Sequence, residues 1–410
     1  MNPTSLEIAK DRSLIFKKLL QTEIDVAANS DKLAFLDRGV QTSSYRKEIK
    51  NYPDYLKQKP DNVKVISYIS QANNPIKFIS FPSLGIIPKI NTEPLKFLHE
   101  DIQQASVCIG TFVEGKIQTK WLGKNSLTKA QFWSATKIVP LINTVCQVNI
   151  KYPNCDISNC AIRDADGQQN DILFDDLATD MIGYTENIAT SNSLGAMFKR
   201  FDTRGGMEQW LKKTTGNNDL NFRSEYGEDP FIENPEIFDT IKQQVLLTAA
   251  ENSPQQDNFV SAYDLTKLVS MLGWHCHLEQ RSRLRGAQWN SLKSIVKAMG
   301  NDTARYGDEA IKTLGLDSVI TSPVIISKLG YGVSSIRQTV ETVYVALMWF
   351  VDERPRATGK PAKLRTLGMT LRGVRALDGS SSTDRLAIEL DARICAEVTE
   401  ILRRLFAEEF

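Results

Sequence analysis

Strand-like segments occur at two places that lie far apart in the chain. The first block contains ASVCIGTFV and KIQTKWLG, which Glu114-Gly115 joins as a hairpin. The second block contains SPVIISKLGYG, QTVETVYVALMWFVDE and AKLRTLGMTLRGV, which are rich in β-branched and aromatic residues. The simplest assembly that buries both blocks pairs them in one antiparallel sheet.

Helical patterns fill the sequence between the two strand blocks and also flank them. Residues 170–315 read as mostly helical, including EIFDTIKQQVLLTAAEN at 236–252, and NTEPLKFLHEDIQQAS at 91–106 also reads as a helix. SLIFKKLLQTEI near the start and TDRLAIELDARICAEVTEILRRLF near the end are amphipathic. We expect the first and last helices to pack on the sheet.

The predicted fold class is therefore α+β, an antiparallel sheet flanked by terminal helices with an inserted all-helical domain. The expected domains are an N-terminal extension (1–90, helical with short strands), a sheet domain (91–130 with 318–410) and an all-helical domain (131–317).

Composition excludes several classes of function. The chain has 410 residues and a formal net charge of +1, so its overall field favours neither nucleic acid nor an anionic membrane. No apolar run is long enough to span a bilayer, and charges interrupt the N-terminal apolar clusters, which predicts a cytoplasmic location for the chain as written. The six cysteines are scattered, and free thiols are expected. No histidine or cysteine group has the spacing of a zinc site, so we expect no metal.

Four Ser-x-x-Lys sequences occur, and their contexts differ. They begin at Ser44, Ser126, Ser134 and Ser294. The first lies in a polar stretch, the second resembles a turn or helix cap, and the lysines near the fourth are expected to face water. Ser134 instead opens a strongly apolar helix, ATKIVPLINTV, whose start is expected to be buried between layers.

Ser134 and Lys137 have the spacing that nucleophilic chemistry needs. Positions i and i+3 lie on one face of a helix. A serine hydroxyl requires a base, and a lysine can serve when burial favours its neutral form. Backbone N–H groups at the helix start can hold an oxyanion. Because so short a motif often occurs by chance, further motifs have to support it.

Two further motifs give the chain a resemblance to the penicillin-binding and serine β-lactamase-like hydrolases, with the class A β-lactamases as the nearest pattern. That superfamily has Ser-x-x-Lys on a buried helix, then Ser-x-Asn or Tyr-x-Asn among helices, then Lys-Thr/Ser-Gly on a strand. Here Ser134-Ala-Thr-Lys137 matches the first motif, Thr190-Ser191-Asn192 resembles the second and Lys328-Leu329-Gly330 resembles the third. The resemblance covers about residues 90–410 and implies the β-lactamase/transpeptidase-like fold.

The resemblance also implies catalytic roles. Ser134 would attack a carbonyl to form an acyl-enzyme, and Lys137 would take its proton. Thr190 would relay a proton to the leaving group, and Asn192 would bind the substrate amide and Lys137. Lys328 would add positive charge beside the relay hydroxyl.

Further implied positions bind the substrate or act in deacylation. The backbone N–H groups of Ser134 and Tyr331 would form the oxyanion hole, with Gly330 and Leu329 beside the substrate. Leu329 replaces a hydroxyl that in the superfamily helps to bind the substrate carboxylate, which argues against ordinary β-lactam recognition. The acidic loop FRSEYGEDPFIEN offers Glu228, and less favourably Glu225, as a deacylation base.

The second motif allows a different alignment. Ser191 can be the relay with Ser193 where asparagine is expected, but that alignment loses the amide, so Thr190 and Asn192 are preferred. Tyr184 in GYTEN resembles a Tyr-x-x-Asn remnant, although the spacing does not fit Tyr-x-Asn.

The sequence therefore predicts a serine hydrolase or acyltransferase that acts on an amide or ester and needs no cofactor. Its partner would be a small-molecule or peptide acyl substrate, such as a β-lactam or a peptide, and not a nucleic acid. The alternative is a catalytically retired relative that binds a ligand or partner. The oligomeric state is not set by the sequence, and the resemblance implies a periplasmic or extracellular location.

Overall fold

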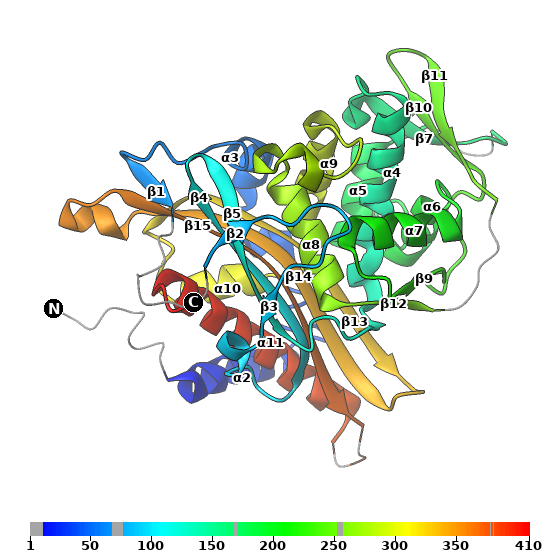
Figure 1. Cartoon of the computed structure of the whole chain (residues 1–410). Coiled ribbons are helices and arrows are strands. Elements are labelled where there is room, and N and C mark those ends of the chain that lie inside the picture. Colours follow the sequence, from blue (N-terminus) through cyan, green and yellow to red (C-terminus); the bar gives the residue numbers. More distant parts are fainter. Residues whose placement is uncertain (1–10, 68–76, 168–170, 252–256, 378, 380) are drawn as a thin grey trace.

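The computed structural model describes residues 11–67, 77–167, 171–251, 257–377, 379 and 381–410. Its largest sheet is mixed and has eight strands (Figure 1). The strands along its path, in spatial order, are β13 (Ile320–Ser334), β14 (Thr339–Asp352), β15 (Ala362–Ala376), β4 (Ile102–Val113), β5 (Lys116–Lys124) and β2 (Ile79–Ser80). Neighbouring strands along this path are antiparallel. Two short strands join it in parallel, β1 (Val65–Ser67) on β15 and β3 (Ile90–Asn91) on β5.

The contact between β15 and β4 joins the two strand blocks. Thr366 pairs with Gly110 and Leu371 with Ala105, although more than 200 residues separate the strands in sequence. The predicted assembly of both blocks into one sheet is confirmed.

Helices cover both faces of this sheet. Helix α8 (Ala262–Gly273) packs on β4, β14 and β15, while α11 (Thr383–Phe406) packs on β14 and β15 from the other side, with α2 (Arg12–Ala27) and α10 (Tyr306–Thr313) against it (Figure 1). Strand β14 is therefore buried on both faces, which explains its nearly continuous apolar sequence. The expected packing on the sheet is confirmed for the last helix, α11, whereas the first helix, α2, packs on α11.

The N-terminal residues belong to the sheet domain and do not form a separate extension. Helix α2 packs along α11, and β1 and β2 pair with β15 and β5. Helix α3 (Tyr52–Tyr55) packs on β13 and on α9 (Trp289–Gly300). The expected boundary near residue 90 is thus wrong, because the apolar faces of these segments are buried against the C-terminal half of the chain. Residues 1–10 and 68–76 lie outside the described part.

The region 131–317 is only partly helical. Its further helices are α4 (Ile138–Lys151), α5 (Phe174–Gly183), α6 (Ser191–Lys199) and α7 (Arg204–Thr215). It also contains a four-stranded sheet of β11 (Gln244–Thr248), β10 (Pro235–Asp239), β7 (Cys160–Asp164) and β8 (Ile172–Leu173), and a three-stranded sheet of β6 (Ala130–Gln131), β12 (Asn258–Val260) and β9 (Asn221–Phe222). The expectation of an all-helical domain is corrected accordingly.

Two predicted helices are strands in the structure. Within the segment 236–252, residues 236–248 belong to the hairpin β10–β11, which turns through Gln243 at a φ of 54°, and residue 252 lies outside the described part. The segment 91–106 contains only a short 3₁₀ turn at Glu93–Leu95 before β4 begins at Ile102. In both segments cross-strand pairing overrides the local helical pattern.

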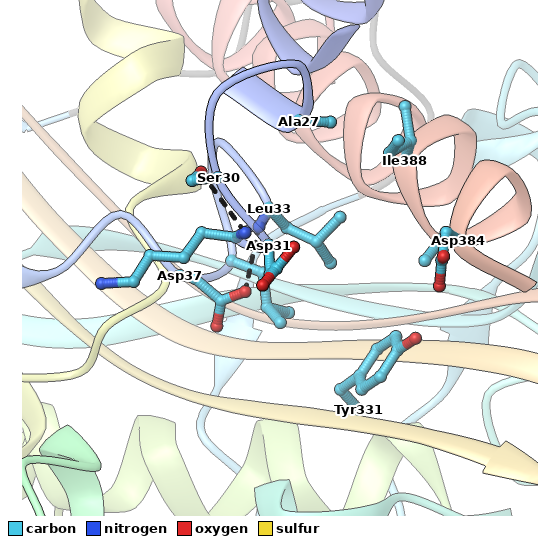
Figure 2. Close-up of a pocket in the computed structure, with 11 residues that line it drawn as sticks. Ala27, Ser30, Asp31, Leu33, Asp37, Tyr331, Asp384 and Ile388 are labelled. Atoms are coloured by element: carbon cyan, nitrogen blue, oxygen red, sulfur yellow. Dashed lines mark hydrogen bonds between the residues drawn. The ribbon is translucent and has the colours of Figure 1, made fainter.

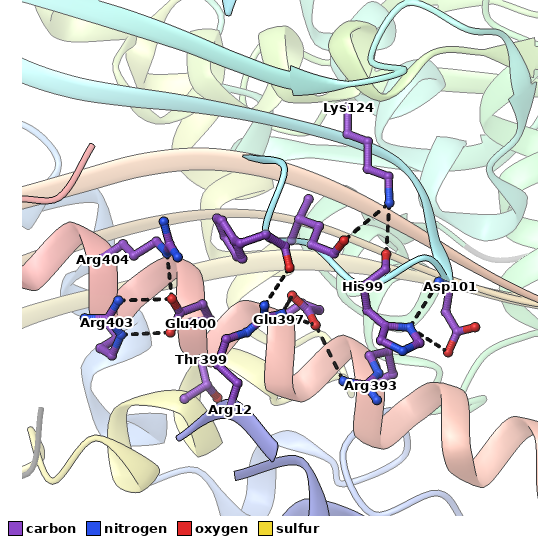
Figure 3. A network of polar contacts seen from close by, with 12 residues as sticks. Arg12, His99, Asp101, Lys124, Arg393, Glu397, Thr399, Glu400, Arg403 and Arg404 are labelled. Carbon is purple, nitrogen blue, oxygen red and sulfur yellow. Dashed lines mark hydrogen bonds and ion pairs between the residues drawn. The ribbon is translucent and has the colours of Figure 1, made fainter. Parts of the chain in front are cut away.

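An ion pair between α2 and α11 holds the N-terminal helix in place (Figure 3). Arg12 Nη2 donates to both carboxylate oxygens of Glu397, at 2.8 and 2.7 Å, and Arg12 Nη1 donates to the carbonyl oxygen of Phe97 at 2.6 Å. Glu397 is fully buried; burial raises the pKa of its carboxyl, and the charges of Arg12 and Arg393 oppose that rise. None of the described helices combines the length and apolar character needed to cross a bilayer.

Arg12→Ala should lower the free energy of unfolding by about 2 kcal/mol, because it removes two charge-assisted hydrogen bonds from a buried carboxylate whose remaining ion-pair partner, Arg393, lies 3.6 Å away. Urea denaturation measures this change. Arg385→Ala is the control, since Arg385 pairs with Glu389 at the exposed start of the same helix and should cost less than about 0.5 kcal/mol. Equal losses in the two variants would contradict the assignment.

Candidate active site

Burial separates Lys137 from the lysines of the other three Ser-x-x-Lys sequences. Lys47, Lys129 and Lys297 are exposed, whereas the Lys137 side chain has no exposed surface. The helix that follows it, α4, is buried along most of its length. Only the pair Ser134–Lys137 therefore lies in an environment that can change the chemistry of the lysine.

A strained residue precedes Ser134. The chain enters a 3₁₀ turn, η4 (Trp133–Lys137), before α4 begins, and Trp133 has a φ of 49°. That left-handed conformation is a genuine outlier for so bulky a residue. Thr136 Oγ1 donates to the Trp133 carbonyl at 2.8 Å and Ala135 N donates to the Phe132 carbonyl at 3.1 Å, so the turn is closed around Ser134.

A buried carboxylate fixes the side chain of Trp133. Its Nε1 donates to Glu341 Oε2 at 2.8 Å, and Glu341 also binds Arg337 and Arg372 at 2.8 and 2.9 Å. Burial would raise the pKa of Glu341, but the hydrogen bond from Arg337 and the charge of Arg372 lower it below its ordinary value. A carboxylate on β14 whose ionised form is favoured thus anchors the residue next to Ser134.

Strand β13 approaches η4 closely because it has glycines at two positions. A Cβ on Gly330 would lie 2.6 Å from the Phe132 carbonyl oxygen and 3.0 Å from Ala135 N. A Cβ on Gly332 would lie 2.5 Å from the Trp133 ring. The predicted third motif therefore lies directly against the turn that carries Ser134.

Lys137 reaches from η4 to helix α6. Its Nζ donates to Ser191 Oγ at 2.8 Å and to Asn192 Oδ1 at 2.7 Å. Gly195 makes room for it, since a Cβ there would be 3.1 Å from Lys137 Cε. Burial, and to a smaller extent the charge of Lys328, lower the pKa of Lys137 well below its ordinary value.

The second motif places Ser191, and not Thr190, against Lys137. Thr190 is the N-cap of α6, where its Oγ1 accepts from Ser193 N at 3.2 Å and donates to Glu228 Oε2. Ser191 is buried, and besides accepting from Lys137 it donates to the Met181 carbonyl at 2.6 Å. The structure thus brings Asn192 and Ser191 to the lysine and leaves Thr190 at the surface.

Tyr184 lies close to both Ser134 and Ser191. Burial raises the pKa of its phenol, and the hydroxyls of Ser134 and Ser191 oppose that rise. Tyr184 ends helix α5 with a φ of 51°, a second strained residue at the site. The Nζ atoms of Lys328 and Lys137 lie 3.8 and 5.3 Å from the centre of its ring, within the range of cation–π contacts.

Lys328 is fully buried on β13. Its Nζ donates to the Ile182 carbonyl at 3.2 Å and lies 3.9 Å from Asp302 Oδ1. Burial lowers the pKa of Lys328 to about 7, although Asp302 opposes this. The amino group therefore loses its charge readily at neutral pH.

The other predicted residues of β13 point elsewhere. Leu329 is 5% exposed and belongs to the apolar core on the α11 side of the sheet. The Tyr331 side chain packs at the edge of that same core, so only its backbone can serve a site at Ser134. The structure places no hydroxyl at the Leu329 position.

The two acidic candidates lie in different surroundings. Glu228 is exposed, accepts from Asn192 Nδ2 at 3.0 Å, and its charge acts on the pKa of Lys137. Glu225 instead forms an ion pair with Arg204. Only Glu228 therefore lies beside the lysine.

The sequence argument missed or set aside three contributors. Ser191 is the less favoured alignment of the second motif because it loses the amide, and the spacing at Tyr184 does not fit Tyr-x-Asn. Trp133 was not considered, since a left-handed backbone at a tryptophan leaves no signal in the sequence. Among the described residues, no three or more His, Cys, Asp or Glu side chains group as metal ligands.

Comparison with known proteins gives similarity to solved structures but to no family model and no curated protein. A solved structure described as "Structure of PBP-A" is similar at 12% sequence identity, over 78% of this chain and 99% of that chain, with a TM-score of 0.37.

The stability of the protein should depend on pH through Lys137. The unfolded chain binds a proton at this residue below about pH 10.4, and the folded protein only at much lower pH. The unfolded state thus holds more protons in that window, so the free energy of unfolding rises with pH there. Relative to Lys137→Met, the free energy of unfolding of the wild-type protein should rise by up to about 1.4 kcal/mol per pH unit on the acid side of about pH 10.4, between the folded and unfolded pKa values of this lysine.

Urea denaturation of both proteins at several pH values in that window tests the expectation. Lys297→Met, at an exposed lysine of another Ser-x-x-Lys sequence, is the control and should give a difference that does not change with pH. A constant difference for Lys137→Met would contradict the low pKa.

Proposed function

We propose that the protein is a serine hydrolase or acyltransferase of the β-lactamase-like type, which acts on an amide or ester through an acyl-enzyme on Ser134. The observation that carries the proposal is the buried Lys137 amino group, one helical turn from Ser134 and bonded to Ser191 and Asn192. A lysine whose neutral form is favoured by burial is a competent base.

We propose a path for the proton through Tyr184, because the hydroxyls of both Ser134 and Ser191 act on the pKa of its phenol. Ser134 Oγ attacks the carbonyl carbon of the substrate, and its proton moves to the Tyr184 oxygen as the Tyr184 proton moves to Ser191. Ser191 turns its own proton from the Met181 carbonyl to Lys137 Nζ, which becomes an ammonium. Reversal of these transfers gives the proton to the leaving group and leaves Ser134 acylated.

Charge at the site stabilises the oxyanion. The backbone N–H groups of Ser134 and Tyr331 form the oxyanion hole in this proposal, since β13 lies against η4 at Gly330. The Lys137 ammonium that forms on attack adds positive charge in a dry environment, where it acts strongly. The strain at Trp133 holds Ser134 in position before substrate binds.

Release of the acyl group requires water or another acceptor. Glu228, held by Asn192 and Thr190 beside Lys137, is the residue that would orient it. Hydrolysis and transfer differ only in whether water or a second nucleophile enters here. All groups in this scheme belong to the polypeptide, so it uses neither a metal nor a cofactor.

A second candidate function is that of a retired relative that binds a ligand without turning it over. The observation that favours it is that Lys328 is engaged by Ile182, Tyr184 and Asp302 while Leu329 is buried in the core. Such a protein would form no covalent adduct.

Ser134→Ala should abolish labelling by a fluorophosphonate probe, which phosphonylates an activated serine and releases fluoride. Intact-mass spectrometry measures the adduct, and Ser44→Ala, at an exposed serine of another Ser-x-x-Lys sequence, should label like the wild type. Labelling that persists in Ser134→Ala would rule out Ser134 as the nucleophile. A folded wild-type protein that gives no adduct with this probe or with an activated ester supports the binding protein instead.

Ser191→Ala should slow acylation by about 10²-fold or more, because it interrupts the path between Ser134 and Lys137. Thr190→Ala is its matched neighbour and should cost about 1 kcal/mol of stability through the lost helix cap, with acylation changed only a few-fold. Stopped-flow rates with an activated ester separate the two. A larger loss of acylation rate in Thr190→Ala than in Ser191→Ala would instead support the alignment in which Thr190 is the relay.

A further inference from the structure

The loop that follows β9, residues 223–231, passes over the start of α6, where Lys137 is bound. Its middle residues, Gly227, Glu228 and Asp229, are exposed. Tyr226, which precedes them, is partly buried, and Lys137 has no exposed surface. Burial therefore increases from the middle of the loop through Tyr226 to the amino group of the lysine.

The ring of Tyr226 lies against the Lys137 side chain over Gly195 of α6. A Cβ on Gly195 would lie 2.9 Å from Tyr226 Cδ2 and 3.1 Å from Lys137 Cε, so ring and lysine meet where this residue has no side chain. Lys137 Nζ lies 5.3 Å from the centre of the ring. The ring thus fills the space between the lysine and the exposed part of the loop.

The hydroxyl of Tyr226 fixes the ring to the turn that carries the nucleophile. Thr136 Oγ1 donates its proton to the Trp133 carbonyl at 2.8 Å, so the Tyr226 hydroxyl is the donor in its contact with Thr136 Oγ1 at 3.2 Å. Thr136 lies in η4 between Ser134 and Lys137. The position of the ring is therefore tied to the same turn as both site residues.

Hydrogen bonds on each side of Tyr226 hold the loop in place. Asn258 of β12 accepts from Ser224 N and donates to the Glu225 carbonyl, both at 3.1 Å. Ser193 of α6 donates through Oγ to the Asp229 carbonyl at 2.8 Å. Residues 223–231 thus form a strap that is fastened before and after its tyrosine.

Charged and titratable groups face Lys137 from several elements. Burial is the largest cause of its low pKa, followed by the charge of Lys328 on β13, and the carboxylate of Glu228 on the strap opposes both. Tyr184, at the end of α5, places its ring 5.3 Å from Lys137 Nζ. Lys199 of α6 lies 4.8 Å from the centre of the ring on the strap. Because burial comes first, the groups that exclude water decide the state of the amine.

We propose that Tyr226 is a positioning residue that excludes water from Lys137, so that the strap 223–231 keeps this amino group neutral. The inference rests on the proposed function, in which neutral Lys137 receives the proton of Ser134. Burial raises the pKa of the Tyr226 phenol, so the phenol stays protonated and acts only through the lysine.

NMR titration of isotope-labelled lysine tests the exclusion of water without any substrate. The Cε signal of Lys137 is identified by its loss in Lys137→Met. In Tyr226→Ala its titration midpoint should rise by about one pH unit or more, because water reaches the charged form. Tyr226→Phe retains the ring and should titrate like the wild type. Tyr55→Ala, at a partly buried tyrosine of α3, is the control and should leave the midpoint unchanged.

The pH dependence of Ser134 acylation by an activated ester gives the second measurement. The acid limb of the profile should move to higher pH in Tyr226→Ala by the same amount as the NMR midpoint, and it should not move in Tyr226→Phe. Tyr226→Leu keeps a smaller apolar side chain and should give intermediate values. It replaces Tyr226→Ala if that variant does not fold.

The outcomes separate the strap from the proposed function. An unchanged Lys137 midpoint in folded Tyr226→Ala or Tyr226→Leu overturns the exclusion of water by Tyr226. Equal rises in Tyr226→Phe and Tyr226→Ala also overturn it, since the hydroxyl and not the ring would then be responsible. Absence of any adduct at Ser134, with a raised midpoint in Tyr226→Ala, overturns the proposed function and supports the shielding of the lysine.

Discussion

The site depends on one energetic constraint, which is the burial of the Lys137 amino group. Within the described residues its Nζ is held by Ser191 Oγ and Asn192 Oδ1 and not by an ion pair. Removing an ammonium from water is costly, so the neutral amine is favoured. This arrangement requires η4, α6 and β13 to pack together. The environment of the lysine therefore depends on the packing of the whole domain.

The surrounding structure maintains that contact at the cost of strain. Trp133 and Tyr184 both adopt left-handed backbone conformations on either side of Ser134. Trp133 is held by its hydrogen bond to Glu341, and the Tyr184 ring lies against Lys328 and Lys137. Strain of this kind persists only where the surroundings over-determine it, and it positions reacting groups in advance.

The described N-terminal residues pack against the C-terminal half of the chain. Helix α2 is fixed on α11 by Arg12 and Glu397. The loop that follows α2 lines a cavity together with Tyr331 and the first turns of α11 (Figure 2). A segment that resembles an appendage in sequence thus forms part of the sheet domain.

The sequence by itself determined the features that repeat with a local period. The apolar run of β14, the buried helix after Ser134 and the terminal helix follow from such patterns. The sequence also predicted Ser134, Asn192 and Lys328 as site residues. Only the tertiary structure showed that Ser191, and not Thr190, contacts Lys137. It also placed Tyr184 and Trp133 near Ser134, and it paired residues 236–248 as a hairpin. These outcomes depend on contacts between residues far apart in the chain, and a one-residue difference at a helix cap decides which hydroxyl is buried.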